Sequence, residues 1–206
     1  MPKRFVSIWF RHLLTDWHEL QNVSLKEKKF VLAAAEHGRM VIQAANPTAQ
    51  RDGICAGMVV ADARAIHPFL EVMDAREDLA VGLLRIIGEW CLRYTPEVAI
   101  DLPDGLLLDI SGCPHLWGGE KPYLKELILK LRAMGYDARG VIADTIGAAW
   151  GVARYGKKYP LVEPGRQKES LEDLPPAALR LDNRTTDRLH KLGLYRIGSF
   201  IDMPRP

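Results

Sequence analysis

The sequence lacks the features that mark secreted, zinc-binding or membrane proteins. Only three cysteines occur, Cys55, Cys91 and Cys113, and none belongs to a C-x-x-C pair. An odd, scattered set argues against a disulfide framework and a zinc site, and it favours a reducing compartment. No apolar run is long enough to span a membrane, and the run at 5–10 is interrupted by Arg11 before it reaches signal-peptide length. The sequence therefore predicts a cytoplasmic protein that has no membrane partner.

Low-complexity tracts, internal repeats and a strong net charge are also missing. Apolar residues make up 48% of the chain and charged residues 26%, a composition typical of globular proteins. Residues 152–206 contain eleven Lys and Arg against seven Asp and Glu, or +4, whereas residues 1–151 sum to −2. A weakly basic C-terminal segment fits either a nucleic-acid contact or a solvated helical face.

The alternation of apolar runs with turn residues predicts an α+β protein. Strands are predicted at 5–10, 30–35, 40–45, 70–73, 98–101, 106–110 and 138–143. Helices are predicted at 48–52, 60–67, 78–94, 121–134 and 145–155. The Pro103-Asp104-Gly105 turn and the Glu36-His37-Gly38-Arg39 turn each indicate a hairpin. The Pro- and Gly-rich segment 160–176 predicts a linker into a small helical unit.

Three segments together resemble the Y-family of translesion DNA polymerases. They are NPTAQRDGICAGM at 46–58, ADAR at 61–64 and LLLDIS at 106–111, in the order and spacing of the family's fingers and palm. The resemblance covers nearly the whole chain. It implies a ferredoxin-like palm sheet with helices on one face, a fingers unit and a small all-helical thumb.

The resemblance also implies domain boundaries. They are 1–28 and 75–159 for a palm-like part, 29–74 for a fingers-like part, 160–176 for a linker and 177–206 for a thumb-like helix–hairpin–helix. In the family a little finger and a clamp-binding tail follow the thumb. The resemblance thus implies that the sequence is a fragment of a longer protein.

The metal-binding carboxylates of the family are largely absent. Templated nucleotidyl transfer needs two metal ions held by clustered carboxylates. The resemblance places Trp9 at the first carboxylate and Asp104 and Gly105 at the second pair. An indole cannot ligate Mg²⁺, which requires oxygen ligands, so Trp9 is expected to be a packing aromatic. Asp104 is a candidate remnant ligand, although Pro-Asp-Gly is equally a plain turn, and Asp101 is a nearby carboxylate.

The residues that grip the incoming nucleotide are replaced as well. The family tyrosine and arginine fall on Pro47 and Gln50, and the late lysine falls on Trp150. Loss of one preorganised donor costs about 10²–10³ in rate. The nucleotide site is therefore predicted to be lost. The first hypothesis is a non-catalytic protein that binds no metal and no cofactor.

Two further segments resemble one particular subgroup of the Y-family. PDGLLLDISGCPHLWGGE at 103–120 and VIADTIGAAWGVARYG at 141–156 resemble the ImuB-type subgroup, whose members are catalytically degenerate. This resemblance implies a scaffold in SOS-induced, error-prone translesion synthesis. It also implies three protein partners: the sliding clamp, a small accessory protein and an error-prone replicative-type polymerase.

The end of the chain resembles half of a helix–hairpin–helix. Such a unit contacts phosphates without reading sequence, through cations and through the backbone amides of a glycine turn. The candidate DNA-binding residues are Arg184, Arg188, Lys191, Gly193 and Arg196. A packed helical pair with solvated basic side chains explains the same pattern.

Two alternatives to a non-catalytic DNA-binding scaffold remain open. A weakly active polymerase would use Asp101 and Asp104, with Asp144 as an optional third carboxylate, as an altered Mg²⁺ site, which requires the carboxylates to converge within about 4–6 Å. A protein-interaction module without DNA binding would show no salt-dependent affinity for DNA.

Overall fold

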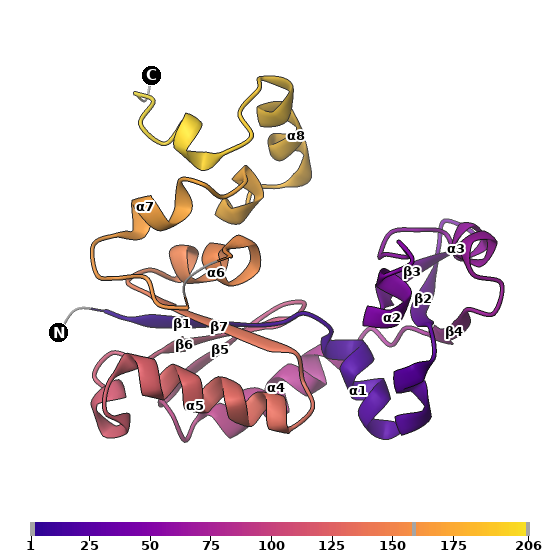
Figure 1. Ribbon diagram of the computed structural model, residues 1–206, viewed down its shortest axis with the longest axis horizontal. Helices are drawn as coiled ribbons and strands as arrows, with labels where there is room; N and C mark the ends of the chain where they lie inside the picture. Colours follow the sequence, from indigo (N-terminus) through magenta and orange to yellow (C-terminus); the bar gives the residue numbers. More distant parts are fainter. Residues whose placement is uncertain (1–2, 158–159, 205–206) are drawn as a thin grey trace.

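The computed structural model describes residues 3–157 and 160–204, which form two separate sheets with helices packed around them (Figure 1). The larger sheet has four antiparallel strands in the order β5-β6-β1-β7, and the smaller has the order β3-β2-β4. The strands are β1 Phe5–Phe10, β2 Phe30–Glu36, β3 Arg39–Ala45, β4 Glu71–Asp74, β5 Glu97–Asp101, β6 Gly105–Asp109 and β7 Ala138–Ala143. All seven predicted strands are confirmed to within one or two residues.

The helices include every predicted one and some that were not predicted. The α-helices are α1 Leu13–Gln21, α2 Pro47–Gln50, α3 Val60–Ile66, α4 Leu79–Cys91, α5 Glu120–Ala133, α6 Ile146–Tyr155, α7 Gln167–Leu171 and α8 Asn183–Lys191. The 3₁₀ helices are η1 Val23–Glu27, η2 Pro114–Trp117, η3 Pro176–Leu179 and η4 Ile197–Ser199. Helix α1 has no start signal in the sequence, because its N-cap residue His12 makes no side-chain capping bond. Within the described ranges, each helix is too short or too polar to cross a bilayer.

Helices cover both faces of the four-stranded sheet (Figure 1). Val6, Ile8 and Phe10 of β1 pack in one core together with α4 and α5. Trp9, which is offset by one residue from Ile8 and Phe10, packs in the other core together with α6 and Val141. The prediction of helices on one face holds for α4 and α5 and is wrong for α6. The small residues of α6, mainly alanines, allow the helix to lie close to this second face.

The smaller sheet is anchored by Asn46, the first residue of the NPTAQ segment. This side chain is fully buried. Its Oδ1 accepts hydrogen bonds from the amides of Ala49 and Phe30, at 3.1 and 3.2 Å, and its Nδ2 donates to Lys28 O at 2.9 Å. Asn46 thereby caps α2 and joins it to β2. The most recognisable segment of the sequence thus serves a structural purpose.

The segment 160–176, predicted as a linker, packs against the larger sheet and contains α7. Leu161 forms a parallel bridge with Ile142 of β7, and Val162 is buried. Leu174 of this segment and Ile197 beyond it are buried in the core that contains α6, whereas α8 has no buried residue. Helix α8 is therefore held through the segments on either side of it.

Candidate functional site

Trp9 and the β5–β6 turn meet at one end of the four-stranded sheet. Trp9 lies opposite Gly105 in the β1–β6 ladder. Its indole Nε1 donates a hydrogen bond to Asp104 Oδ2 at 2.9 Å, and its ring is partly buried against the core of α6. The expected packing aromatic thus also has a polar contact with the candidate remnant carboxylate.

Arg154 of α6 lies between the two carboxylates of this turn. Its Nη2 is 2.8 Å from Asp104 Oδ1 and 3.3 Å from Asp101 Oδ2. The Arg154 side chain is only 9% exposed, and those of Asp101 and Asp104 are 10% and 29% exposed. Its guanidinium carbon lies 4.4 Å from the centre of the Trp150 ring, within cation–π range. The protein therefore supplies its own cation to this carboxylate pair.

Arg180 completes the cluster from the end of η3. It forms an ion pair with Asp101 Oδ1, and its guanidinium carbon lies 4.6 Å from the Trp150 ring centre. Asp101 thus binds two guanidinium groups, one through each oxygen. With two arginines and two aspartates in contact, the formal charges of the cluster cancel.

The surroundings of Gly105 are tight for any side chain. A Cβ at residue 105 would lie 3.0 Å from Arg154 Nη2, 3.0 Å from the backbone oxygen of Ile8 and 3.2 Å from that of Asp101. Two of these three neighbours are backbone atoms, which cannot rotate away. A side chain at residue 105 would therefore require these neighbours to shift by a few tenths of an ångström.

Asp144 lies at the opposite end of the sheet from this cluster. Its Oδ1 is 2.5 Å from Arg4 Nη1, and its Oδ2 accepts the Gly165 amide hydrogen bond at 2.7 Å. Although desolvation acts to raise it, the hydrogen bonds from Gly165 and Arg4 hold the pKa of Asp144 below its ordinary value. Asp144 follows the β7 residue paired with Phe5, which is four residues, or about 13 Å of strand, from Trp9.

Asp144 therefore does not converge with Asp101 and Asp104, as the altered-metal alternative would require of all three carboxylates. Asp101 and Asp104 do meet on Arg154, but the third carboxylate belongs to a different ion-pair network. Across residues 3–157 and 160–204, no three His, Cys, Asp or Glu side chains are grouped as metal ligands would be.

The predicted nucleotide positions carry local structural contacts. Pro47 occupies the first turn of α2, and Gln50 Nε2 donates to Ala45 O at 2.9 Å. Trp150 stacks with Arg154 and Arg180. A cavity of about 330 Å³ remains beside the cluster, and its lining is Trp9, Leu102, Pro103, Asp104, Trp150, Arg154 and Tyr155.

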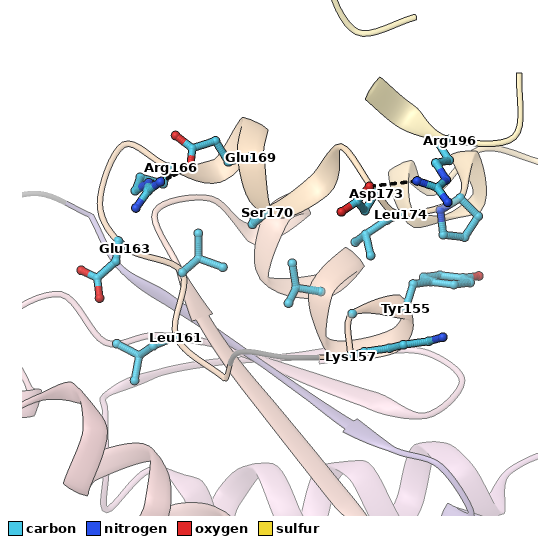
Figure 2. A pocket seen from close by; sticks show the side chains of 14 residues that line it. Tyr155, Lys157, Leu161, Glu163, Arg166, Glu169, Ser170, Asp173, Leu174 and Arg196 are labelled. Atoms are coloured by element: carbon cyan, nitrogen blue, oxygen red, sulfur yellow. Dashed lines mark hydrogen bonds and ion pairs between the residues drawn. The ribbon is translucent and has the colours of Figure 1, made fainter. Parts of the chain in front are cut away.

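A larger cavity of about 900 Å³ lies away from these positions, between α6, α7 and the segment that precedes η3 (Figure 2). Figure 2 shows ion pairs on its rim, between Arg166 and Glu169 and between Arg196 and Asp173. None of the predicted metal or nucleotide positions lines it.

The predicted DNA-binding residues share one region but differ in what they offer. Arg184, Arg188 and Lys191 are exposed on α8 at helical spacings of four and three, so they lie along one side of the helix. Arg196 pairs with Asp173 at 3.2 Å. Gly193, at φ 78°, ends α8, and its amide donates to His190 O at 2.9 Å. The cationic side chains, rather than the Gly193 amide, are thus available to a phosphate.

Residues 8–154 match the model of the impB/mucB/samB family, which is 147 of the 206 residues. The chain belongs to the impB/mucB/samB family. Protein ImuB of Caulobacter vibrioides (strain NA1000 / CB15N) is 43% identical over 153 residues, which is 74% of this chain and 33% of that protein. DNA polymerase IV of Aeromonas hydrophila subsp. hydrophila is 27% identical over 178 residues, 84% of this chain and 51% of that protein.

Solved structures of DNA polymerases have the same fold as this chain, which confirms the predicted Y-family fold. The post-insertion binary complex of Dbh DNA polymerase superposes with a TM-score of 0.80 at 16% identity, covering 98% of this chain and 60% of the Dbh chain. DinB from Sulfolobus solfataricus gives a TM-score of 0.75 at 16% identity, with the same coverage. This chain spans about a third of the ImuB sequence that it matches.

Arg154 and Arg180 are the site residues that were not predicted from the sequence. A local signal existed for Arg154, because it lies four residues after Trp150 on a predicted helix and so on the same face. There was no local signal for Arg180 in the sequence, since its contact with Asp101 joins residues 79 positions apart.

Proposed function

We propose that this chain is part of a non-catalytic, Y-family-like scaffold that binds DNA in error-prone translesion repair. The observation that carries the proposal is the guanidinium of Arg154, 2.8 Å from Asp104 and 3.3 Å from Asp101. A divalent cation would have to displace a buried, always-protonated side chain from both carboxylates. With Trp9 at the first carboxylate position, too few oxygen ligands remain for two-metal chemistry.

The DNA-binding part of the proposal rests on α8. Arg184, Arg188 and Lys191 are exposed along one side of it, and none of them forms an ion pair within the described parts of the chain. Such a row can neutralise successive phosphates without reading base sequence. The similar solved structures include post-insertion and insertion complexes of Dbh DNA polymerase, which supports DNA as a ligand of this fold.

The finer parts of the role rest on the ImuB relationship. They are induction by DNA damage, assembly with the sliding clamp, and recruitment of a small accessory protein and an error-prone replicative-type polymerase. Because the chain spans 33% of the ImuB protein, the proposal assigns these contacts to the full-length protein.

Primer extension tests the absence of catalysis. The purified full-length protein is incubated with a primer–template, all four dNTPs and either Mg²⁺ or Mn²⁺. No template-dependent extension is expected. Extension that disappears in Asp104→Asn, but persists in the matched variant Asp62→Asn, would establish the altered-metal polymerase and overturn the proposal. Asp62 is the control because it is an exposed carboxylate of α3 in the smaller sheet's unit.

Fluorescence anisotropy with labelled primer–template at several salt concentrations tests DNA binding. The triple variant R184A/R188A/K191A is expected to lower the slope of log K against log salt by about three units. The control K121A/K125A/K130A removes the same charge from exposed positions of α5 and should leave the slope unchanged. Salt-independent binding, or no binding, would favour a protein-interaction module instead.

A further inference from the structure

Arg180 has an unusual backbone conformation for its residue type. It ends η3 with φ 60° and ψ 27°, in the left-handed region. A side chain there costs about 1–2 kcal/mol relative to glycine, which adopts this conformation freely. Strained positions of this kind persist only where the contacts around them hold the backbone in place. The contacts of the Arg180 side chain therefore show what the conformation serves.

These contacts end a ladder of alternating cations and indoles across the sheet. The guanidinium carbon of Arg11 lies 5.4 Å from the Trp9 ring centre, and that of Arg154 lies 5.9 Å from Trp9 and 4.4 Å from Trp150. Arg180 then lies 4.6 Å from Trp150. The ladder begins at the end of β1, crosses α6 and ends on η3.

Asp101 forms ion pairs with the last two arginines of the ladder, Arg154 and Arg180. One of its oxygens binds Arg154 and the other binds Arg180, although its own side chain is only 10% exposed. A bond from one buried carboxylate to two guanidinium groups joins the β5–β6 turn, α6 and η3 at a single point.

The backbone of η3 is packed directly on α6 at the same place. A Cβ at Gly151 would lie 2.6 Å from the carbonyl oxygen of Ala178, and Ala178 is buried. Past Arg180 the chain enters α8, whose N-cap is Asp182 and which buries no residue of its own. The other support of α8 is Ile197, fully buried, whose amide donates to Leu174 O at 2.9 Å.

We propose that Arg180 is a latch that fixes the entry of α8 relative to the palm, with Asp101 and Trp150 as its receptor. Through its ion pairs with Arg154 and Arg180, Asp101 holds the segment that leads into α8 in one orientation. The exposed cations of α8 are then presented to DNA at a set angle, with no need for metal or nucleotide. The DNA-presenting part of this inference rests on the proposed function.

Distance measurement between α5 and α8 tests the latch. Bioorthogonal spin labels at Glu126 and Asp187, both exposed, report the distribution of distances by double electron–electron resonance in the full-length protein. Arg180→Gly removes the side chain and relieves the left-handed backbone, so the fold is expected to persist. A broader distribution is expected in this variant, and an intermediate one in Arg180→Lys, which keeps the charge but loses the planar stack.

His37→Gly is the matched control, because His37 also has a positive φ, 48°, but lies in the β2–β3 turn. It should leave the distribution unchanged. An Arg180→Gly distribution that superimposes on that of the unsubstituted protein would overturn the latch. The primer-extension and salt-slope results do not depend on that outcome, so failure of the latch and failure of the proposed function are distinguishable.

Discussion

The palm cluster and the surface of α8 use the same residue type for opposite purposes. Arg154 is 91% buried, and Arg154 and Arg180 are bound to carboxylates and indoles of the same chain. Arg184 and Arg188 of α8 are exposed to solvent. The first pair stabilises the fold, and the second is available to a polyanion. The number of cations in a segment is thus a poor guide to binding unless their partners are known.

The largest effect that tests this contrast is expected from Arg154→Met. The substitution leaves Asp104 and Asp101 near indoles with one cation fewer. The free energy of unfolding in urea should fall by about 2–4 kcal/mol. The control Arg166→Met breaks a pair whose side chains are 64% and 57% exposed, and should cost less than about 0.5 kcal/mol. Equal losses of unfolding free energy in Arg154→Met and Arg166→Met would contradict the distinction between buried and exposed arginines.

A second test concerns the steric closure of the palm site. Gly105→Ala places a methyl group 3.0 Å from Arg154 Nη2 and from a backbone oxygen, and should destabilise the protein by about 1–3 kcal/mol. Gly82→Ala, in α4 with nothing within 4 Å of its Cβ, should instead stabilise by about 0.5–1 kcal/mol. Urea unfolding of both variants measures the difference. A neutral Gly105→Ala would mean that the site can open.

Asp16 contrasts with Asp101 and Asp104, because it is a buried carboxylate that forms no ion pair within the described ranges. Burial raises its pKa to about 6, although the Asp137 amide donates to it at 2.8 Å. The folded state therefore binds the proton more tightly than the unfolded state. The resulting stabilisation is full below about pH 4 and is lost as the pH rises through about 6.

Asp16→Asn removes this dependence while keeping an acceptor for the Asp137 amide. Relative to the variant, the unsubstituted protein should lose on the order of 1–2 kcal/mol between pH 4 and pH 7. Thermal or urea unfolding at several pH values measures this difference. A constant difference across the range would contradict the raised pKa.

The smallest effect on folding is expected from Arg188→Ala. Because this side chain is exposed on α8, the free energy of unfolding should change by less than about 0.5 kcal/mol. The slope of log K against log salt for DNA should fall by about one unit. If Arg188→Ala lowered the free energy of unfolding but left the salt slope unchanged, α8 would have the structural role that is assigned here to the palm cluster.

Local patterns in the sequence predicted most of the fold. The Pro103-Asp104-Gly105 turn and the period-two strands on either side of it correctly gave the β5–β6 hairpin. Helix α1 was missed, because it follows β1 with neither a glycine nor a capping side chain to mark its start. The packing role of Trp9, which lies in the core that contains α6, was also predicted, since residue chemistry alone excludes an indole as a Mg²⁺ ligand.

The contacts that define the candidate site could not be predicted in the same way. Arg154 binds carboxylates 50 and 53 positions earlier, and Arg180 binds one 79 positions earlier. No periodicity connects such residues, because only the packing of α6 and η3 onto the sheet brings them together. The mistaken inclusion of Asp144 has the same origin, since strand β7 carries it to the far end of the sheet.

Gly105 also bears on how such a palm could regain a metal. A carboxylate introduced at 105 first would meet the Arg154 guanidinium and two backbone oxygens. Replacement of Arg154 first would leave two acidic side chains without their shared cation. Either single step passes through a less stable protein, so each substitution is better tolerated when the other accompanies it. The tight packing around Gly105 therefore opposes the return of a carboxylate to this position as long as Arg154 is present.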